Sequence, residues 1–427
     1  MPDIANTADG ALAGRRVLII VENLPSPFDR RVWQEAGAMR DAGAKVSIIC
    51  PTGKGYEARF ERLDGIDIHR HPLPPEGNGA LGYLIEYGAA LFWETVLAWR
   101  VFFSGGVDVI QACNPPDLIF LVAAPFKLLG RKFVFDHHDI CPELFEAKFG
   151  RRGAFHRMLT LFERLTFALA DISIATNESY RQIAIARGRM DPRDVFVVRS
   201  GPDLRRLKPV PPDPRWRNGR RFLVGYVGVM GEQEGVDLLL DAVAALVKRG
   251  RDDVQFCIVG GGPSLASLRE RCAAQGLDPY VTFTGRAPDA DLFEILSTAD
   301  VCVNPDRVNA MNDKSTMNKI LEYMAFGKPI VQFELTEGRV SAADASLYAR
   351  PNDPIDMADK IEALLASPET RERMGAIGVA RVAEDLSWAH QVPKLMAAYD
   401  RLFSRGRRNS ALGGPAIRTQ GVGTGDE

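Results

Sequence analysis

Short apolar runs alternate with amphipathic stretches along the first half of the chain. The segment FDRRVWQEAGAMRDAG at 28–43, for example, carries apolar residues at helical spacing. Runs that are apolar almost throughout are typical of parallel strands buried on both faces, and the segments between them are typical of crossover helices. The pattern therefore predicts a doubly wound parallel α/β sheet. Its expected strands are RRVLIIVEN, AKVSIICP, VDVIQACNP, KFVFDHHD, ADISIATN and DVFVVRSG.

A proline-rich segment at 208–221, KPVPPDPRWRNGRR, interrupts this pattern. Proline lacks the amide hydrogen that a helix interior or a central strand needs, so we interpret the segment as a linker. The alternation then restarts, which predicts a second doubly wound sheet. The expected strands of this sheet are FLVGYVGVMG, VQFCIVGGG, VTFTGRAP, ADVCVNP, KPIVQFEL and SLYARP.

The chain is therefore expected to form two Rossmann-like domains, as its 427 residues also suggest. The first covers 13–207 and is joined by a C-terminal helix at about 386–404, and the second covers 222–385. The polar, Gly-rich tail at 405–427 is expected to be disordered. Two such domains enclose a cleft between the carboxyl ends of their strands, where open α/β sheets bind ligands.

The composition excludes some classes of protein. The chain has 53 basic and 55 acidic side chains, a balance that does not indicate a nucleic-acid-binding protein. The six cysteines have no CxxC spacing and mostly lie in apolar runs, which indicates reduced, buried thiols. With no basic and apolar leader at the N-terminus, a cytoplasmic location is expected.

The apolar segment at 79–103 is long enough to span a bilayer, but Glu86, Glu94 and Arg100 interrupt it. We expect it not to be transmembrane. One interpretation is a core helix packed on the sheet. The other is an interfacial helix at the cytoplasmic face of a membrane, because its aromatic residues and the basic segment KFGRRGAFHR at 148–157 suit anionic headgroups.

The segment NDKSTMNKILEYMAFGKPIV at 312–331 carries the clearest candidate chemistry. Ser315, Lys319 and Glu322 are spaced to share one helix face, with Thr316 beside them. Free amides, two hydroxyls and a cation at a helix start suit a diphosphate, and a carboxylate one turn later suits a ribose diol. The alternative is a solvent-exposed Lys–Glu pair on a surface helix.

A glycine-rich turn, GYVGVMGEQEGVD at 225–237, follows the first strand of the second domain. Gly228 and its neighbouring glycines permit close approach of a phosphate to a helix N-terminus. Tight packing alone explains such glycines equally well. Glu232 and Glu234 in the same turn would repel a phosphate.

These motifs together resemble the family 4 glycosyltransferases, which have the GT-B fold, use nucleotide sugars and retain the anomeric configuration. The resemblance covers about 15–403 and rests on the glycine turn, VQFCIVGGGP, VTFTGRAPDADLFEILSTADVCVNP and MNKILEYMAFGKPIV. It implies that the second domain binds the donor, without metal or cofactor. Glu322 would hold the ribose, Arg286 would lie near the base, and His138 would contact the donor sugar.

The chain departs from the family pattern at three donor contacts. Lys314 stands where the family usually has the first glutamate of its motif, and Val229 and Glu234 stand where it commonly has cations for the diphosphate. We therefore expect Lys319, Ser315 and Thr316 to hold the leaving diphosphate.

The first domain supplies the candidate acceptor wall. Asp29, Arg30 and Arg31 follow the first strand, and two arginines there suit the phosphates of a lipid-linked acceptor or of the donor. The alternative is a surface helix that Asp29 caps, with exposed arginines. Asn114 in CNPPD, at the end of another strand, is expected on the same side.

His137 and His138 end a strand in FVFDHHDICPELF, so at most one of them faces the cleft directly. A metal site is not expected, because these histidines and the acids beside them lack typical ligand spacing. A purely structural histidine pair remains an alternative.

The leading hypothesis is a retaining glycosyltransferase that acts on a carbohydrate or polyprenyl-diphosphate-linked acceptor in cell-surface or exopolysaccharide biosynthesis. One alternative is a nucleotide-sugar epimerase, for which Asp136, His138 and Asp139 could supply acid and base groups. Another is a non-catalytic nucleotide-sugar-binding module, suggested by the departures at Lys314, Val229 and Glu234.

Overall fold

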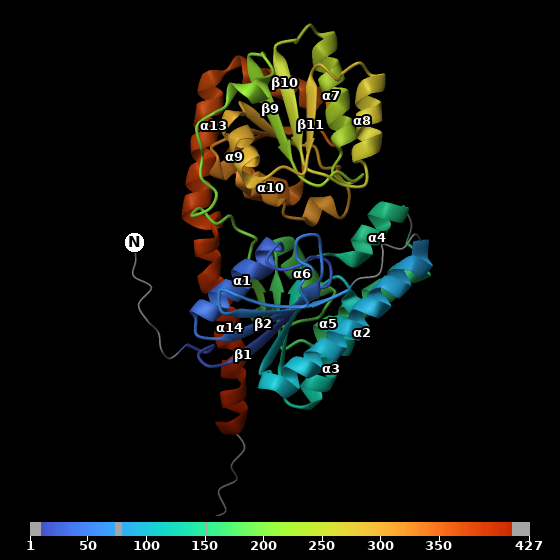
Figure 1. Ribbon diagram of the computed structural model, residues 1–427, viewed down its shortest axis with the longest axis vertical. Coiled ribbons are helices and arrows are strands. Elements are labelled where there is room, and N and C mark those ends of the chain that lie inside the picture. The colour runs from blue at the N-terminus through green and yellow to red at the C-terminus, as the bar shows by residue number, and fades with distance from the viewer. Residues whose placement is uncertain (1–9, 73–78, 151, 412–427) are drawn as a thin grey trace, which may run out of the picture.

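The computed structural model describes residues 10–72, 79–150 and 152–411. It contains two α/β lobes, one above the other in Figure 1, with helix α13 beside the upper lobe and the C-terminal helix α14 beside the lower one. Each lobe is built on one sheet, with helices on both faces of the sheet. The two doubly wound domains expected from the sequence are confirmed.

The first sheet has eight strands in the order β3-β4-β2-β1-β5-β6-β7-β8. The six expected strands are present and parallel, and the sheet gains an edge hairpin that the sequence analysis missed. Asp64 and Gly65, both at positive φ, make its turn. The strands are β1 Arg16–Ile20, β2 Lys45–Pro51, β3 Phe60–Leu63, β4 Ile66–His71, β5 Val109–Cys113, β6 Lys132–His137, β7 Ile172–Ala175 and β8 Val195–Val197.

Alternate residues of β1 enter two separate cores, as the period of a strand requires. Val17 and Ile19 contribute to the core beneath α1 and the C-terminal helix. Leu18 and Ile20 contribute to the core on the other face. The helices of the first domain are α1 Arg30–Asp41, α2 Gly79–Gly105, α3 Phe120–Leu128, α4 Cys141–Phe149, α5 Ala154–Leu169 and α6 Glu178–Ala186.

Helix α2 covers the sheet with one side and shows apolar side chains on the other. Ala98 and Val101 are buried, whereas Phe92 and Phe103 are exposed. Glu94, which interrupts the apolar run, is also fully buried and does not face solvent. Among the described residues, none of the helices combines the length and apolar character needed to cross a bilayer.

The second sheet has six parallel strands in the order β11-β10-β9-β12-β13-β14, and all six were expected. Helices α7, α8 and α12 pack on one face, and α9 and α10 pack on the other. The strands are β9 Phe222–Val227, β10 Val254–Val259, β11 Val281–Gly285, β12 Val301–Asn304, β13 Ile330–Phe333 and β14 Ser346–Ala349. The helices are α7 Val236–Lys248, α8 Leu265–Ala274, α9 Asp289–Thr298, α10 Asn318–Ala325, α11 Thr336–Ala342, α12 Pro354–Ala366 and α13 Pro368–Arg381.

The C-terminal helix α14, Trp388–Ala411, returns the chain to the first domain. Leu395 and Leu402 enter the core beneath α1, and the buried Tyr399 hydroxyl donates to Gln111 Oε1 at 2.6 Å. The helix is described as far as Ala411 and so includes residues 405–411 of the tail expected to be disordered, which stays a prediction. Residues 412–427 lie outside the described residues.

Candidate functional site

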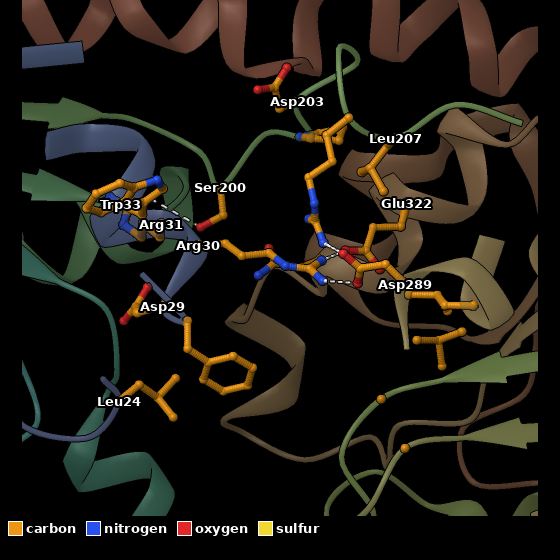
Figure 2. A pocket seen from close by; sticks show the side chains of 18 of the residues that line it. Leu24, Asp29, Arg30, Arg31, Trp33, Ser200, Asp203, Leu207, Asp289 and Glu322 are labelled. Carbon is orange, nitrogen blue, oxygen red and sulfur yellow. Dashed lines mark hydrogen bonds and ion pairs between the residues drawn. The ribbon is translucent and has the colours of Figure 1, made fainter. Parts of the chain in front are cut away.

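A cleft of about 1240 Å³ separates the two lobes. The turn between β1 and α1 lines it from the first domain, and loops after β9, β10 and β11 line it from the second. These are carboxyl ends of parallel strands, where α/β sheets generally bind ligands. Figure 2 shows the side chains that meet across this cleft.

The glycine-rich turn after β9 is packed tightly. A Cβ on Gly260, which has φ +133°, would collide with the carbonyl oxygen of Gly228. Some amides of the turn are also occupied, since Gly228 N–H donates to Val259 O and Gly231 N–H donates to the Glu234 carboxylate. Gly228 lines the cleft, but its packing supports the structural interpretation of these glycines rather than a phosphate cradle.

Helix α10 begins at Asn318, so Ser315 and Thr316 precede it and the predicted shared helix face is wrong for both. The Ser315 hydroxyl donates to Met311 O at 2.9 Å. Thr316 Oγ1 accepts from Asn177 Nδ2 at 3.0 Å. Within the described part of the chain, the lining of the cleft includes neither hydroxyl, because both lie in contacts with their own loop or the first domain.

Lys319 is on α10 but is directed beneath the glycine turn. Its Nζ lies 2.7 Å from Asp306 Oδ1, and its side chain is 12% exposed. Burial opposes the charge of Lys319, but Asp306 outweighs burial and raises the pKa of the ammonium group. Burial raises the pKa of Asp306, and Lys319 opposes that rise. The expected placement of Lys319 in the cleft is therefore wrong, because a buried carboxylate holds it.

Glu322 and Arg286 do line the cleft, as expected. The Glu322 side chain is 16% exposed and accepts from Arg30 Nη1 at 3.0 Å. Burial raises the pKa of Glu322, and Arg30 opposes that rise. The Arg286 guanidinium lies 4.3 Å from the centre of the Phe28 ring, so the two domains touch here.

The start of α1 presents three polar side chains with different environments. Asp29 caps the helix by accepting from Val32 N–H at 3.1 Å, as the alternative interpretation expected, and it also lines the cleft. Arg30 reaches across the cleft to Glu322 and to Asp289. Arg31 is buried, so its interpretation as an exposed surface arginine is wrong.

Arg31 belongs to a buried cluster behind the cleft. It contacts Asp136 at 2.9 Å and Glu35 at 3.0 Å, and its Nε lies 2.9 Å from His138 Nε2. Burial would raise the pKa of Asp136, but Arg31 and His138 lower it well below its usual range. Burial raises the pKa of Glu35. The sequence analysis missed Glu35, although its i,i+4 spacing from Arg31 was a signal for the pair.

His138 is held on the edge of this cluster. Its Nε2 lies 2.8 Å from Asp136 Oδ2 as well as close to Arg31. His137 points elsewhere and is fully buried, as the alternation of a strand requires. In the described chain, the residues lining the cleft do not include His138.

Asn114 is a structural residue, and its expected place on the acceptor wall is wrong. Its Oδ1 accepts from the amides of His138 at 2.8 Å and Asp139 at 3.1 Å, and its Nδ2 donates to Asp117 at 2.8 Å. The side chain is buried and organises the loop after β6. It thereby positions His138 from behind.

Cys113, Asp136 and His138 bring three potential metal ligands within 4.8 Å of one another. The Arg31 guanidinium already contacts two of the three side chains. Its fixed positive charge would repel a metal cation placed among them. The cluster is therefore poorly suited to a metal ion.

The departures from the family pattern now have locations. Lys314 Nζ lies 3.4 Å from Glu143 of the first domain, and Glu234 accepts from its own turn. Val229 lines the cleft and is exposed. Two arginine contacts that the sequence analysis missed involve Asp289, which pairs with Arg206 as well as with Arg30.

Comparisons with known proteins cover both lobes. Residues 29–206 match the model of "Glycosyltransferase Family 4", and residues 221–367 match that of "Glycosyl transferases group 1". The α-D-kanosaminyltransferase of Streptomyces kanamyceticus is 33% identical over 36% of this chain and 39% of its own length. The 2-deoxystreptamine glucosyltransferase of the same organism is 24% identical over 80% of this chain and 90% of its own.

Solved structures resemble the whole fold. Sucrose-phosphate synthase from Thermosynechococcus elongatus has a TM-score of 0.75 at 18% identity, covering 92% of this chain and 100% of that one. Anabaena HepE in complex with UDP and glucose has a TM-score of 0.67 at 17% identity, covering 93% and 100%. The match spans about two fifths of the length of the kanosaminyltransferase and nine tenths of the length of the glucosyltransferase.

Proposed function

Since the chain belongs to the family 4 glycosyltransferases and has the GT-B fold, we propose that it transfers a sugar with retention of configuration from a nucleoside diphosphate sugar. The acceptor in this proposal is a glycan or a polyprenyl-diphosphate-linked sugar. The proposal includes no cofactor and no metal ion.

The observation that carries the proposal is that Glu322 and Arg286 both line the second-domain wall of the cleft. Glu322 is a nearly buried carboxylate that can accept from both hydroxyls of a ribose diol. Arg286 follows β11 and lies against the Phe28 ring, and both residues line the cleft, where the proposal places the nucleobase. The description of HepE with UDP and glucose supports placing a nucleotide in such a cleft.

The chemistry would be mostly electrostatic. Departure of the nucleoside diphosphate leaves positive character on the sugar and negative charge on the phosphate, so groups fixed in a water-poor cleft stabilise both. The His138 ring contacts Arg31 and Asp136 through Nε2, and its side chain is 14% exposed at the edge of the cluster behind the cleft. We propose that this exposed part of the ring contacts the donor sugar.

Two alternatives are separated by one screen of UDP-, GDP- and ADP-sugars without an acceptor. Slow hydrolysis of one donor, accelerated transfer when an acceptor is added and no epimerised donor would support the transferase. Conversion of the donor to its epimer would instead establish an epimerase. Failure of every donor to bind in calorimetric titration would leave only a non-catalytic module and overturn the proposal.

We further propose that the enzyme works at the inner face of the cytoplasmic membrane, in cell-surface or exopolysaccharide biosynthesis. The supporting feature is a set of exposed apolar side chains on neighbouring helices of the first domain. It comprises Phe92, Val96 and Phe103 of α2, Leu121 and Leu128 of α3, and Phe155, Met158, Leu161 and Leu165 of α5. A lipid-linked acceptor would present its sugar to the cleft from such a surface.

A further inference from the structure

The leaving diphosphate needs a cation, and Lys319 of the second domain does not present one to the cleft. Lys319 is paired with Asp306 beneath Gly228, and the amides of Gly228 and Gly231 donate within the protein. Among the described residues, the basic side chains that line the cleft are Arg30, Arg31, Arg206 and Arg286. The cation must therefore be sought among four arginines.

Two of these arginines are committed to other contacts. Arg31 is buried against Asp136 and Glu35, and moving it would leave both carboxylates without their cation. Arg286 lies on the ring of Phe28, at the site proposed for the base. Arg31 is therefore held in place, and Arg286 has the base as its partner in the proposed function.

Arg30 has the required freedom. It is the first residue of α1, its side chain is 46% exposed, and it crosses the cleft from the first domain to the second. Its Nη1 lies 3.0 Å from Glu322, and its Nη2 lies 3.5 Å from Asp289. An arginine fork can bind two oxygens of a phosphate in the same way as it binds a carboxylate.

The contact with Glu322 creates a competition, provided that the proposed function is correct. Glu322 holds the ribose in that proposal, but Arg30 occupies it in this structure. A bound nucleotide must therefore displace the guanidinium. The diphosphate of a nucleotide is attached to the one exocyclic carbon of the ribose and therefore lies close to Glu322. The guanidinium of Arg30, once displaced from Glu322, has this more highly charged anion within reach.

We propose that Arg30 is an exchangeable catalytic cation, which neutralises Glu322 in the empty cleft and moves to the leaving diphosphate when the ribose takes Glu322. The exchange keeps both anions paired and links donor binding to α1 of the acceptor domain. Arg206 contacts Asp289 and stays with it, so Asp289 also keeps a cation after Arg30 moves.

Titration of matched ligands tests the exchange. Wild-type protein is titrated with UDP, GDP and ADP, and then with the nucleoside of whichever base binds. In Arg30→Ala the nucleoside should bind more tightly, because its competitor for Glu322 is gone, and the diphosphate should contribute less. The ratio of nucleoside diphosphate to nucleoside affinity should fall by about tenfold or more, as expected for one charge-assisted contact.

The control is Arg193→Ala, because Arg193 is exposed, and neither it nor its partner Asp191 is among the residues that line the cleft. Its ratio should stay within about twofold of wild type. Arg30→Lys should give an intermediate ratio, since it keeps the charge but loses the fork. A role of Arg30 only in holding the domains together would change both affinities alike, leave the ratio unchanged and overturn the inference.

Turnover gives a second readout. Removal of a cation from the leaving group should lower kcat of Arg30→Ala by about a hundredfold, whereas Arg193→Ala should retain wild-type kcat. Wild-type kcat in Arg30→Ala would contradict the proposal. Failure of wild-type protein to bind any nucleoside diphosphate would refute the proposed function itself, which is a different result from an unchanged affinity ratio.

Discussion

Lys319 and Glu322 lie one turn apart on α10 but have different environments. Lys319 is directed to Asp306 under the glycine turn, and Glu322 is directed into the cleft. The environments differ because Lys319 meets Asp306 across a loop of its own domain, whereas Glu322 meets Arg30 of the first domain. We therefore predict that Glu322 contributes to nucleotide binding and that Lys319 contributes to stability instead.

Glu322→Gln should weaken nucleoside diphosphate binding by about 1.5 kcal/mol or more, because a neutral amide accepts more weakly from the ribose hydroxyls. Isothermal titration of the substituted protein measures the change. Glu334→Gln is the control, since Glu334 is an exposed carboxylate that pairs with Arg339. Unchanged affinity in Glu322→Gln would reject the ribose assignment.

Lys319→Met should lower the free energy of unfolding by about 3–5 kcal/mol, because it leaves the Asp306 carboxylate buried without a cation. Chemical denaturation measures this loss. The double substitution Lys319→Met with Asp306→Asn removes both charges and should recover most of the stability.

The same double variant reports on catalysis. If Lys319 held the leaving diphosphate, as the sequence suggested, removal of its ammonium group would cost about a hundredfold in kcat/KM. With Asp306 removed as well, we now expect kcat/KM to stay within about tenfold of wild type. A hundredfold loss in a stable double variant would return Lys319 to the diphosphate.

At the scale of elements, α2 buries a carboxylate within an apolar face. Glu94 is fully buried, and neither of its carboxylate oxygens has a hydrogen-bond partner among the described residues. Burial, together with Glu22, raises the pKa of Glu94 to about 8. The folded protein therefore favours the protonated form of this side chain.

Stability should consequently depend on pH. At a pH between the ordinary pKa of 4.5 and the raised pKa of about 8, the folded state keeps a proton on Glu94 that the unfolded state has lost. Below pH 4.5 the protonated Glu94 contributes its whole share of the free energy of unfolding. That contribution should fall by about 1.4 kcal/mol per pH unit as the pH rises through this interval.

Glu94→Gln should remove that slope and make the protein more stable than wild type near the upper end of the interval. Urea denaturation across the interval measures it. Glu372→Gln, an exposed position on α13, should keep the wild-type slope. Identical slopes in wild type and Glu94→Gln would show that Glu94 is ionised when buried or reaches water.

At the scale of the whole molecule, α2, α3 and α5 gather on one side of the first domain (Figure 1). Leu128 is 89% exposed and Phe103 is 78% exposed, and Arg157 and Arg164 of α5 add positive charge. Exposed apolar side chains with cations among them suit the interface of an anionic bilayer.

The protein should therefore bind anionic vesicles peripherally and lose binding at high salt, because each cation near the surface contributes about 1 kcal/mol. Sedimentation with anionic and with neutral vesicles at low and high salt measures this. Arg151→Glu with Arg152→Glu should weaken binding. Arg152 is exposed and lies 2.9 Å from Glu146, whereas Arg151 lies outside the described residues.

Arg350→Glu with Arg373→Glu, on the second domain, is the matched charge reversal and should bind as wild type does. Protein that stays in the supernatant at low salt would contradict membrane contact. Equal sedimentation with neutral vesicles would contradict its electrostatic part.

The arrangement of strands and crossover helices could be predicted from the sequence because it depends on local periods. Twelve expected strands are present in two parallel sheets. The hairpin of β3 and β4 was missed because β3, FERL, is a short edge strand with charged residues and no apolar face. Its Asp64–Gly65 turn was the available signal.

For the candidate site, the sequence by itself determined which residues end the strands and which belong to α10, and these include Glu322 and Arg286. It did not determine which side chains meet. Arg30 and Glu322 are 292 positions apart, and Lys319 reaches Asp306 across a loop. Such pairs depend on the approach of separate elements, so only the tertiary structure decided that Lys319 is buried and that Arg30 occupies the cleft.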